Sequence, residues 1–113
     1  MTTLTVAVQG PYTLDNETVD SVVTRTSPGV YVLANAGSNT ARRVGRSDTD
    51  VRGRLKTYVG NYGQFWFAYA SSPKDAFEKE CHLWHELKPA DNTIHPDRPS
   101  GSGWKCPVCP IFD

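Results

Sequence analysis

Two short, uninterrupted apolar segments constrain the fold of this chain most strongly. Residues 30–34 (Val-Tyr-Val-Leu-Ala) follow the helix- and strand-breaking Ser27-Pro28-Gly29, and residues 65–70 (Phe-Trp-Phe-Ala-Tyr-Ala) are rich in aromatic side chains. Apolar runs of this length without polar alternation are typical of strands that are buried on both faces. Both segments are therefore predicted to be sheet strands, and the aromatic segment is predicted to be core rather than a base-stacking platform.

The remaining elements follow from shorter patterns. A strand is predicted at residues 4–9, ending at Gly10-Pro11, and a short helix or turn within residues 13–23. A second strand at about residues 41–45 would form a hairpin with residues 30–34, and a short amphipathic helix is expected over residues 51–59. Ser72 and Pro73 open a longer helix that reaches Leu87. The predicted order is β-α-β-β-α-β-α, an α/β (α+β) fold with a small mixed or antiparallel sheet of about three strands flanked by helices.

The length and composition indicate one small domain. The chain has 113 residues, which is enough to bury a core without obligatory disulfides or metal. No apolar run approaches the roughly 20 residues of a membrane helix, and residues 1–5 lack the features of a secretory signal. We therefore expect a cytoplasmic protein with no membrane contact.

Basic residues are concentrated in one part of a chain whose formal net charge is zero. Half of the 12 lysine and arginine residues fall between positions 42 and 56, namely Arg42, Arg43, Arg46, Arg52, Arg54 and Lys56. A local basic patch on a neutral protein fits a confined phosphate site. The alternative is a solvated helix face paired with Asp48 and Asp50.

The order of several short motifs resembles the GIY-YIG endonuclease domain over residues 28–92. These motifs are Gly29-Val30-Tyr31, Arg43-Val44-Gly45, Arg54 with Tyr58, Glu80 and Pro89-Ala90-Asp91-Asn92. The resemblance implies a β-β-α-β-α core, with an N-terminal strand and helix extension at residues 1–27. Residues 93–113 would form a cysteine-containing tail packed on that core.

The resemblance also implies an activity, which is hydrolysis of DNA phosphodiester bonds with a divalent metal ion. Glu80 would hold Mg²⁺ or Mn²⁺, Arg54 would stabilise the developing negative charge, and Tyr31 would orient or deprotonate the attacking water. Tyr58 would position the phosphate and Asn92 would support the metal site. The substrate-binding residues would be Arg42, Arg43, Arg46, Arg52 and Lys56. The helical pattern independently places Glu80 beside an apolar stripe, where a carboxylate is expected to be partly buried.

One departure from the family pattern leaves a second function open. Arg43 stands where the second half-motif has a tyrosine. The alternative is therefore a catalytically silent module that keeps the fold and binds nucleic acid or another protein. No element that reads bases is visible, so specificity for a DNA substrate, such as a branched or damaged one, would come from its shape or from a partner. No organic cofactor is expected, and the oligomeric state is left open.

The cysteine and histidine residues predict a structural zinc site. Cys106-Pro107-Val108-Cys109 has the spacing of a zinc knuckle, and Cys81 and His85 lie at i and i+4 of the predicted last helix. We expect Cys81, His85, Cys106 and Cys109 to bind Zn²⁺, with His95 or His82 as an alternative ligand. Isolated reduced thiols, or a zinc-stabilised domain with an unrelated role, are the competing interpretations.

Overall fold

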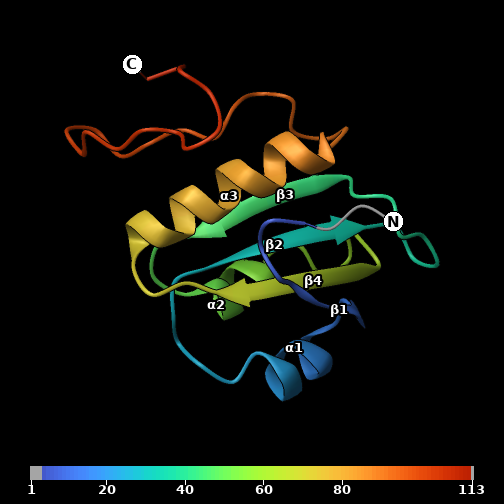
Figure 1. Ribbon diagram of the computed structural model, residues 1–113. Coiled ribbons are helices and arrows are strands. Elements are labelled where there is room, and N and C mark those ends of the chain that lie inside the picture. Colours follow the sequence, from blue (N-terminus) through green and yellow to red (C-terminus); the bar gives the residue numbers. More distant parts are fainter. Residues whose placement is uncertain (1–3, 113) are drawn as a thin grey trace.

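The computed structural model describes residues 4–112 and shows an antiparallel sheet between two layers of helices (Figure 1). Helix α3 covers one face of the sheet, and helices α1 and α2 lie on the other face. The predicted order of elements is confirmed: β1 (Gln9–Thr13), α1 (Asn16–Val22), β2 (Gly29–Ala34), β3 (Arg43–Ser47), α2 (Val51–Lys56), β4 (Gln64–Tyr69) and α3 (Pro73–Leu87).

The sheet has four strands in the order β1-β4-β2-β3, so the expected count of about three was too low. All strand pairs are antiparallel, and β2 is bonded to β4 on one side and β3 on the other. Tyr31, in the middle of β2, pairs with Gly45 of β3 and with Phe67 of β4. This register places the motif Gly29-Val30-Tyr31 beside the strand that contains Arg43-Val44-Gly45.

The prediction of a strand at residues 4–9 was wrong, because the first strand is Gln9–Thr13 and runs through Gly10-Pro11. A proline is compatible with an edge strand, and the register between β1 and β4 shifts between Gln9 and Tyr12 at this point. The segment before β1 still contributes to the core, since Val6 is buried against the α3 side of the sheet.

Strand β2 supplies side chains to two cores. Val30 and Val32 face α3, where they pack with Leu83, and Tyr31 and Leu33 face α1 and α2. The alternation follows from the two-residue repeat of a strand. A strand buried on both faces, as predicted for residues 30–34, is therefore confirmed, and every residue of β2 is buried.

The end of α2 and the start of β3 differ from their predicted positions. Helix α2 ends at Lys56 rather than near residue 59, because the N–H groups of Tyr58 and Val59 donate to carbonyls only three residues back. Strand β3 starts at Arg43 instead of about residue 41. Helix α3 begins as predicted, with the Ser72 hydroxyl accepting a hydrogen bond from the Asp75 N–H at 3.0 Å.

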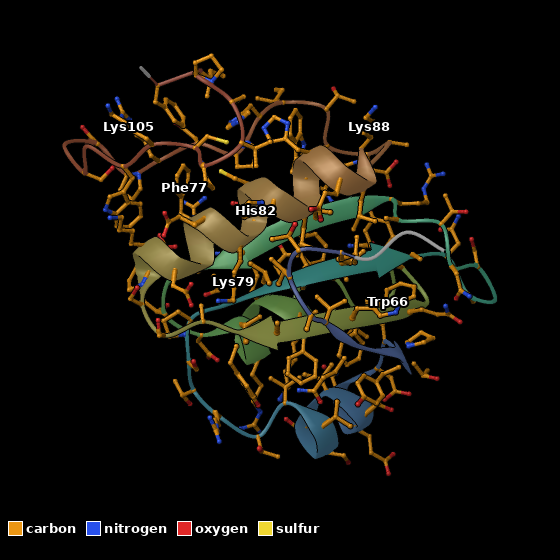
Figure 2. All side chains as sticks on the ribbon, in the orientation of Figure 1. Trp66, Phe77, Lys79, His82, Lys88 and Lys105 are labelled. Carbon is orange, nitrogen blue, oxygen red and sulfur yellow. The ribbon has the colours of Figure 1, made fainter. Side chains whose placement is uncertain are left out.

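The C-terminal segment, residues 93–112, has no helix or strand and lies along the outer side of α3 (Figure 1). Phe77 and Cys81 of α3 form a small apolar cluster with Cys106, to which Trp104 and Phe112 also pack. Figure 2 shows Phe77 on the side of α3 that faces this segment. Within residues 4–112, no helix combines the length and the apolar character that a membrane crossing requires.

Candidate active site and metal centre

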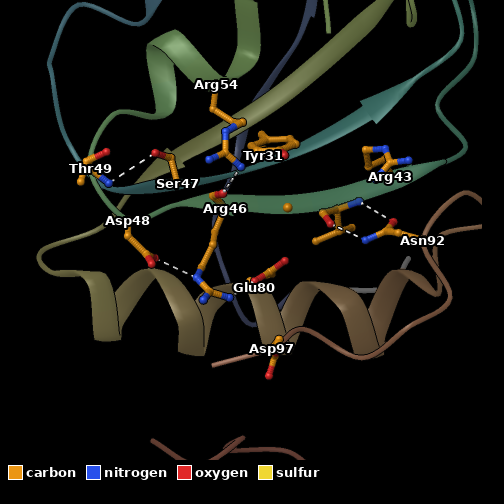
Figure 3. A pocket seen from close by; sticks show the side chains of 12 residues that line it. Tyr31, Arg43, Arg46, Ser47, Asp48, Thr49, Arg54, Glu80, Asn92 and Asp97 are labelled. Atoms are coloured by element: carbon orange, nitrogen blue, oxygen red, sulfur yellow. Dashed lines mark hydrogen bonds and ion pairs between the residues drawn. The ribbon is translucent and has the colours of Figure 1, made fainter. Parts of the chain in front are cut away.

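A polar pocket of about 470 Å³ runs along β3, between the N-terminal part of α2 and the middle of α3 (Figure 3). All five residues of β3 line it, together with side chains from β2, α2, α3 and the segments that follow β3 and α3. The lining is Tyr31, Arg43, Val44, Gly45, Arg46, Ser47, Asp48, Thr49, Arg54, Glu80, Asn92 and Asp97. Four of the five residues predicted to be catalytic therefore line one pocket.

Glu80 lies on the face of α3 that is turned toward β3, and its residue is only 7% exposed. The Arg46 guanidinium donates to its carboxylate at 2.6 Å and to the carboxylate of Asp48 at 2.8 Å. Burial raises the pKa of the Glu80 carboxyl, and the Arg46 guanidinium opposes that rise. The expectation that Glu80 is buried beside an apolar stripe is confirmed, and its charge is balanced by arginine.

Tyr31 reaches the pocket across Gly45, its partner in β3. A Cβ atom at position 45 would overlap the phenol ring, so glycine is required for this approach. The Tyr31 hydroxyl donates to the Tyr58 hydroxyl at 3.4 Å. Burial, followed by this hydrogen bond, raises the pKa of Tyr31, so its phenol is neutral near pH 7 and fits the orienting role better than that of a base.

The two remaining arginines of the pocket approach it from α2 and from the start of β3. The Arg54 guanidinium donates to the Arg46 carbonyl at 3.5 Å and lies beside Tyr31 in Figure 3. Arg43 donates to the Tyr62 hydroxyl at 3.2 Å, and its guanidinium lies 5.5 Å from the centre of the Tyr58 ring. The pocket is thus bordered by several guanidinium groups.

Asn92 ties the segment after α3 to the edge strand. Its side-chain oxygen accepts from the Val44 N–H at 3.1 Å, and its side-chain nitrogen donates to the Val44 carbonyl at 2.6 Å. Both functional groups of the amide are therefore used by the backbone of β3. This arrangement gives Asn92 a positioning role beside the pocket.

The other predicted substrate-binding residues lie outside this pocket. Arg52 and Lys56 both form ion pairs with Asp20, at 2.6 Å each. Arg42 forms a two-bond ion pair with Asp91 and lines a neighbouring hollow of about 530 Å³, which also contains Tyr58. The basic segment therefore divides: Arg43, Arg46 and Arg54 line the pocket, and Arg42, Arg52 and Lys56 pair with Asp20 or Asp91 instead of the expected Asp48 and Asp50.

Several pocket residues were not predicted as site residues. Asp48 was not among the predicted site residues, although its ion pair with Arg46 agrees with the alternative in which basic residues pair with Asp48 and Asp50. Asp97 reaches the rim of the pocket from the C-terminal segment. In the neighbouring hollow, Tyr62 donates to Asp91 at 2.7 Å across 29 positions of sequence, a contact for which the sequence carries no local signal.

A second site lies on the opposite, outer side of α3. One ligand atom from each of His85, His95, Cys106 and Cys109 lies within 4.8 Å of the other three. The His85 and His95 Nε2 atoms are 3.2 Å apart, the Cys106 Sγ is 3.5 Å from the His85 Nε2, and the Cys109 Sγ is 3.3 Å from the His95 Nε2. This cluster could hold a metal ion.

The ligand set differs from the predicted one in a single position, because His95 takes the place of Cys81. The Cys81 side chain is fully buried in the adjoining apolar cluster, where burial raises the pKa of its thiol. His82, the other alternative, lines a different hollow beside residues 5–7. The His95 Nδ1 lies 2.8 Å from the Pro96 carbonyl, which fixes its N–H there and leaves Nε2 free to bind a metal.

Backbone donors also prepare the cluster for a cation. Burial acts to raise the pKa of the Cys106 thiol, but hydrogen bonds from the Val108 and Cys109 N–H groups, from His95 and from Cys81 together outweigh it and lower the pKa to about 6. The Val108 N–H donates to the Cys106 Sγ at 3.4 Å. A thiolate is the form that binds metals.

Comparisons with family models, with curated proteins and with solved structures found no match to this chain. The functional assignment therefore depends on the residues of this chain and their geometry.

Proposed function

We propose that this protein is a divalent-metal-dependent endonuclease that hydrolyses DNA phosphodiester bonds. The observation that supports this best is that one pocket gathers Tyr31, Arg54, Glu80 and Asn92 from four separate segments of the chain. These are residues that the resemblance to GIY-YIG nucleases singles out, and nothing in their spacing along the chain requires them to meet. Their convergence at a polar, arginine-bordered pocket suits a phosphate substrate.

Glu80 is the residue that would hold Mg²⁺ or Mn²⁺. Its carboxylate lines the pocket, and the hydrogen bond from Arg46 goes to one oxygen, Oε1. Mg²⁺ commonly binds one or two carboxylates and keeps several waters, so a single glutamate in a polar pocket is a suitable donor set. When bound, such an ion stabilises negative charge on phosphoryl oxygens and lowers the pKa of a coordinated water.

The side chains of the pocket would bind and orient the substrate. Arg54 and Arg43 line the pocket, where their guanidinium groups would stabilise charge that develops on the oxygens of a bound phosphate. The neutral Tyr31 hydroxyl, supported by Tyr58, would orient the attacking water by hydrogen bonding. Asn92 would hold β3, and with it the floor of the pocket, against α3.

Two observations favour the alternative of a catalytically silent DNA-binding or interaction module. Glu80 already forms an ion pair with Arg46, and Arg43 occupies the position of the second motif tyrosine. In that case the guanidinium groups would bind phosphate without cleavage. DNA binding that persists in Glu80→Gln, with no cleavage by the unaltered protein, would support it.

Nicking of supercoiled plasmid and of branched oligonucleotides with Mg²⁺ or Mn²⁺ tests the proposal. We expect Glu80→Gln and Arg54→Ala each to lower the cleavage rate by about 10²–10³-fold. Arg52→Ala is the matched control, because Arg52 pairs with Asp20 outside the pocket and its loss should leave the rate unchanged. Equal rates for the unaltered protein and Glu80→Gln would reject the nuclease assignment.

We also propose that zinc is the metal of the His85, His95, Cys106 and Cys109 cluster, and that its role there is structural. Tetrahedral zinc with bonds of about 2.0–2.3 Å keeps its ligand atoms about 3.3–3.8 Å apart, close to the distances in this cluster. Four protein ligands leave no open position for a substrate. Metal analysis of the purified protein should find one zinc per chain, and its absence after purification with added zinc would contradict this assignment.

A further inference from the structure

Phe77 connects the two sites through the body of α3. Its ring is fully buried and packs against Trp104 and Phe112 of the C-terminal segment, with ring centres 5.7 and 6.0 Å apart. The Arg46 guanidinium also lies against this ring, 5.2 Å from its centre. Because Arg46 pairs with Glu80, the C-terminal segment contacts the charged group of the pocket through a single aromatic side chain.

A second connection starts at the metal ligands themselves. The Trp84 ring lies 5.0 Å from the His85 ring and 5.1 Å from the His95 ring, measured between centres. Its indole N–H donates to the Asn92 carbonyl at 2.8 Å. Asn92 in turn holds the Val44 backbone with both groups of its side-chain amide, so this contact series ends in the strand that lines the pocket.

The C-terminal segment supplies most of the possible ligands of the metal centre. Residues 93–112 contain no helix or strand, and the apolar cluster that joins them to α3 is small. Three of the four ligands, His95, Cys106 and Cys109, belong to this segment, whereas His85 belongs to α3. An ion at the centre therefore crosslinks the segment to the helix, as structural zinc does in small domains.

We propose that metal bound by His85, His95, Cys106 and Cys109 positions the pocket, through Phe77 to Arg46 and through Trp84 and Asn92 to β3. Metal release frees the C-terminal segment, uncovers Phe77 and loosens the contacts of β3 with the segment after α3. Phe77 and Trp84 are positioning residues, since neither lines the pocket. The consequence for cleavage rests on the proposed nuclease function, whereas the consequence for β3 does not.

Hydrogen exchange tests the structural part without any substrate. The Val44 N–H donates to the Asn92 side chain at the edge of the sheet. Its exchange rate therefore reports on the contacts that run from Trp84 through Asn92 to β3. We expect removal of zinc by a chelator to speed exchange in peptides covering β3, at least about tenfold, and to leave peptides from the β2 and β4 pair unchanged. Readdition of zinc should restore slow exchange. Exchange in β3 that does not respond to zinc would overturn the proposal, whether or not the protein cleaves DNA.

Cleavage kinetics test the catalytic part with Mg²⁺ present in excess. We expect zinc-depleted protein and Phe77→Leu to lose about 10–100-fold in kcat, the range seen when supports of a site are removed, with less change in KM. Phe77→Leu should retain one zinc per chain, which separates loss of positioning from loss of metal. Ile94→Ala, at a position of the C-terminal segment that is 84% exposed, is the matched control.

The outcomes distinguish the two proposals. No cleavage by any preparation, together with zinc-dependent exchange in β3, would reject the nuclease function and retain the link between the sites. Cleavage that is equal with and without zinc would retain the nuclease and overturn the link.

Discussion

The two sides of α3 carry polar sites that are built in opposite ways. On the side of the sheet, the pocket is lined by β3 and by residues from β2, α2 and α3, and its buried carboxylate is paired with Arg46. On the outer side, the metal centre takes three of its four ligands from a segment without regular structure. In the pocket, the carboxylates of Glu80 and Asp48 pair with the guanidinium group of Arg46. In the outer cluster, two thiols and two imidazoles lie close enough together to bind one cation.

Because of this difference, the two sites have different requirements for their formation. The ladder between β2 and β3 sets the register of the β3 residues that line the pocket. A metal ion bound at the cluster would stabilise the fold there, because binding free energy at such sites is also folding free energy. We therefore expect changes in the pocket to alter the stability of the fold, and changes in the cluster to alter metal binding first.

The largest expected effect on stability comes from Arg46→Ala. The side chains of this ion pair are 14% and 10% exposed, so the substitution leaves Glu80 buried without its main partner. Loss of one member of such a pair costs about 3–5 kcal/mol in the free energy of unfolding. Chemical denaturation at neutral pH measures this cost.

Arg52→Ala provides the comparison, since its pair with Asp20 is 37% and 44% exposed and should contribute at most about 1 kcal/mol. The double variant Arg46→Ala, Glu80→Gln should recover part of the loss, because it removes the unpaired charge. A cost for Arg46→Ala no greater than that for Arg52→Ala would show that water solvates Glu80.

The next largest effect distinguishes the ligands of the metal centre. We expect His95→Ala to weaken zinc binding on the order of 100-fold, since about 10–16 kcal/mol of binding free energy is shared among four ligands. Cys81→Ala should retain one zinc per chain, although Cys81 was the ligand expected from helical spacing. Competition with a chromophoric chelator measures both affinities, and a larger loss in Cys81→Ala than in His95→Ala would reverse the assignment.

The predicted ligand set contained Cys81 where the observed cluster has His95, and this difference shows how far the sequence could predict the metal centre. The knuckle at Cys106 and Cys109 and the helical position of His85 were local patterns, and all three residues belong to the cluster. The path of residues 93–105 has no periodicity to predict, so the sequence could not decide which helical or tail residue would be the fourth ligand. Spacing at i and i+4 was satisfied by Cys81, but the apolar cluster of Phe77 and Cys106 encloses its thiol.

The same division between local and distant information applies to the fold and the pocket. Apolar runs and caps predicted the order of the elements, because those signals lie within the elements. The predicted position of strand β1 was wrong because Gly10-Pro11, a pair typical of a strand end, lies inside a strand at this irregular sheet edge. The ion pair between Arg46 and Glu80 joins residues 34 positions apart, and it depends on packing of α3 against β3 that no local pattern encodes.

A smaller effect is expected from Gly45→Ala, which tests whether the pocket geometry depends on the sheet. The added methyl group would meet the Tyr31 ring, with the ring Cζ only 2.5 Å from the new Cβ. Such overpacking costs about 1–3 kcal/mol, measured as a loss in the free energy of unfolding. The cost should fall in a Tyr31→Phe background, because the hydroxyl is the nearest atom, and zinc affinity should not change. An equal cost in both backgrounds would place the strain elsewhere.

The smallest effect is expected in the hollow beside the pocket, where Asp91 accepts from Tyr62 and pairs with Arg42. The Tyr62 hydroxyl and the Arg42 guanidinium lower the pKa of Asp91 below its ordinary value of 3.8. A lowered carboxyl pKa stabilises the fold above that ordinary value, and the contribution is lost as the pH falls through the folded-state pKa. Asp91→Asn should therefore be slightly less stable than the unaltered protein at pH 7, and the difference should shrink in acid below about pH 4. Urea denaturation of both proteins across this range measures the difference. A difference that grows in acid would mean that Asp91 is destabilising when charged, and that Arg42 is free to bind phosphate beside the pocket.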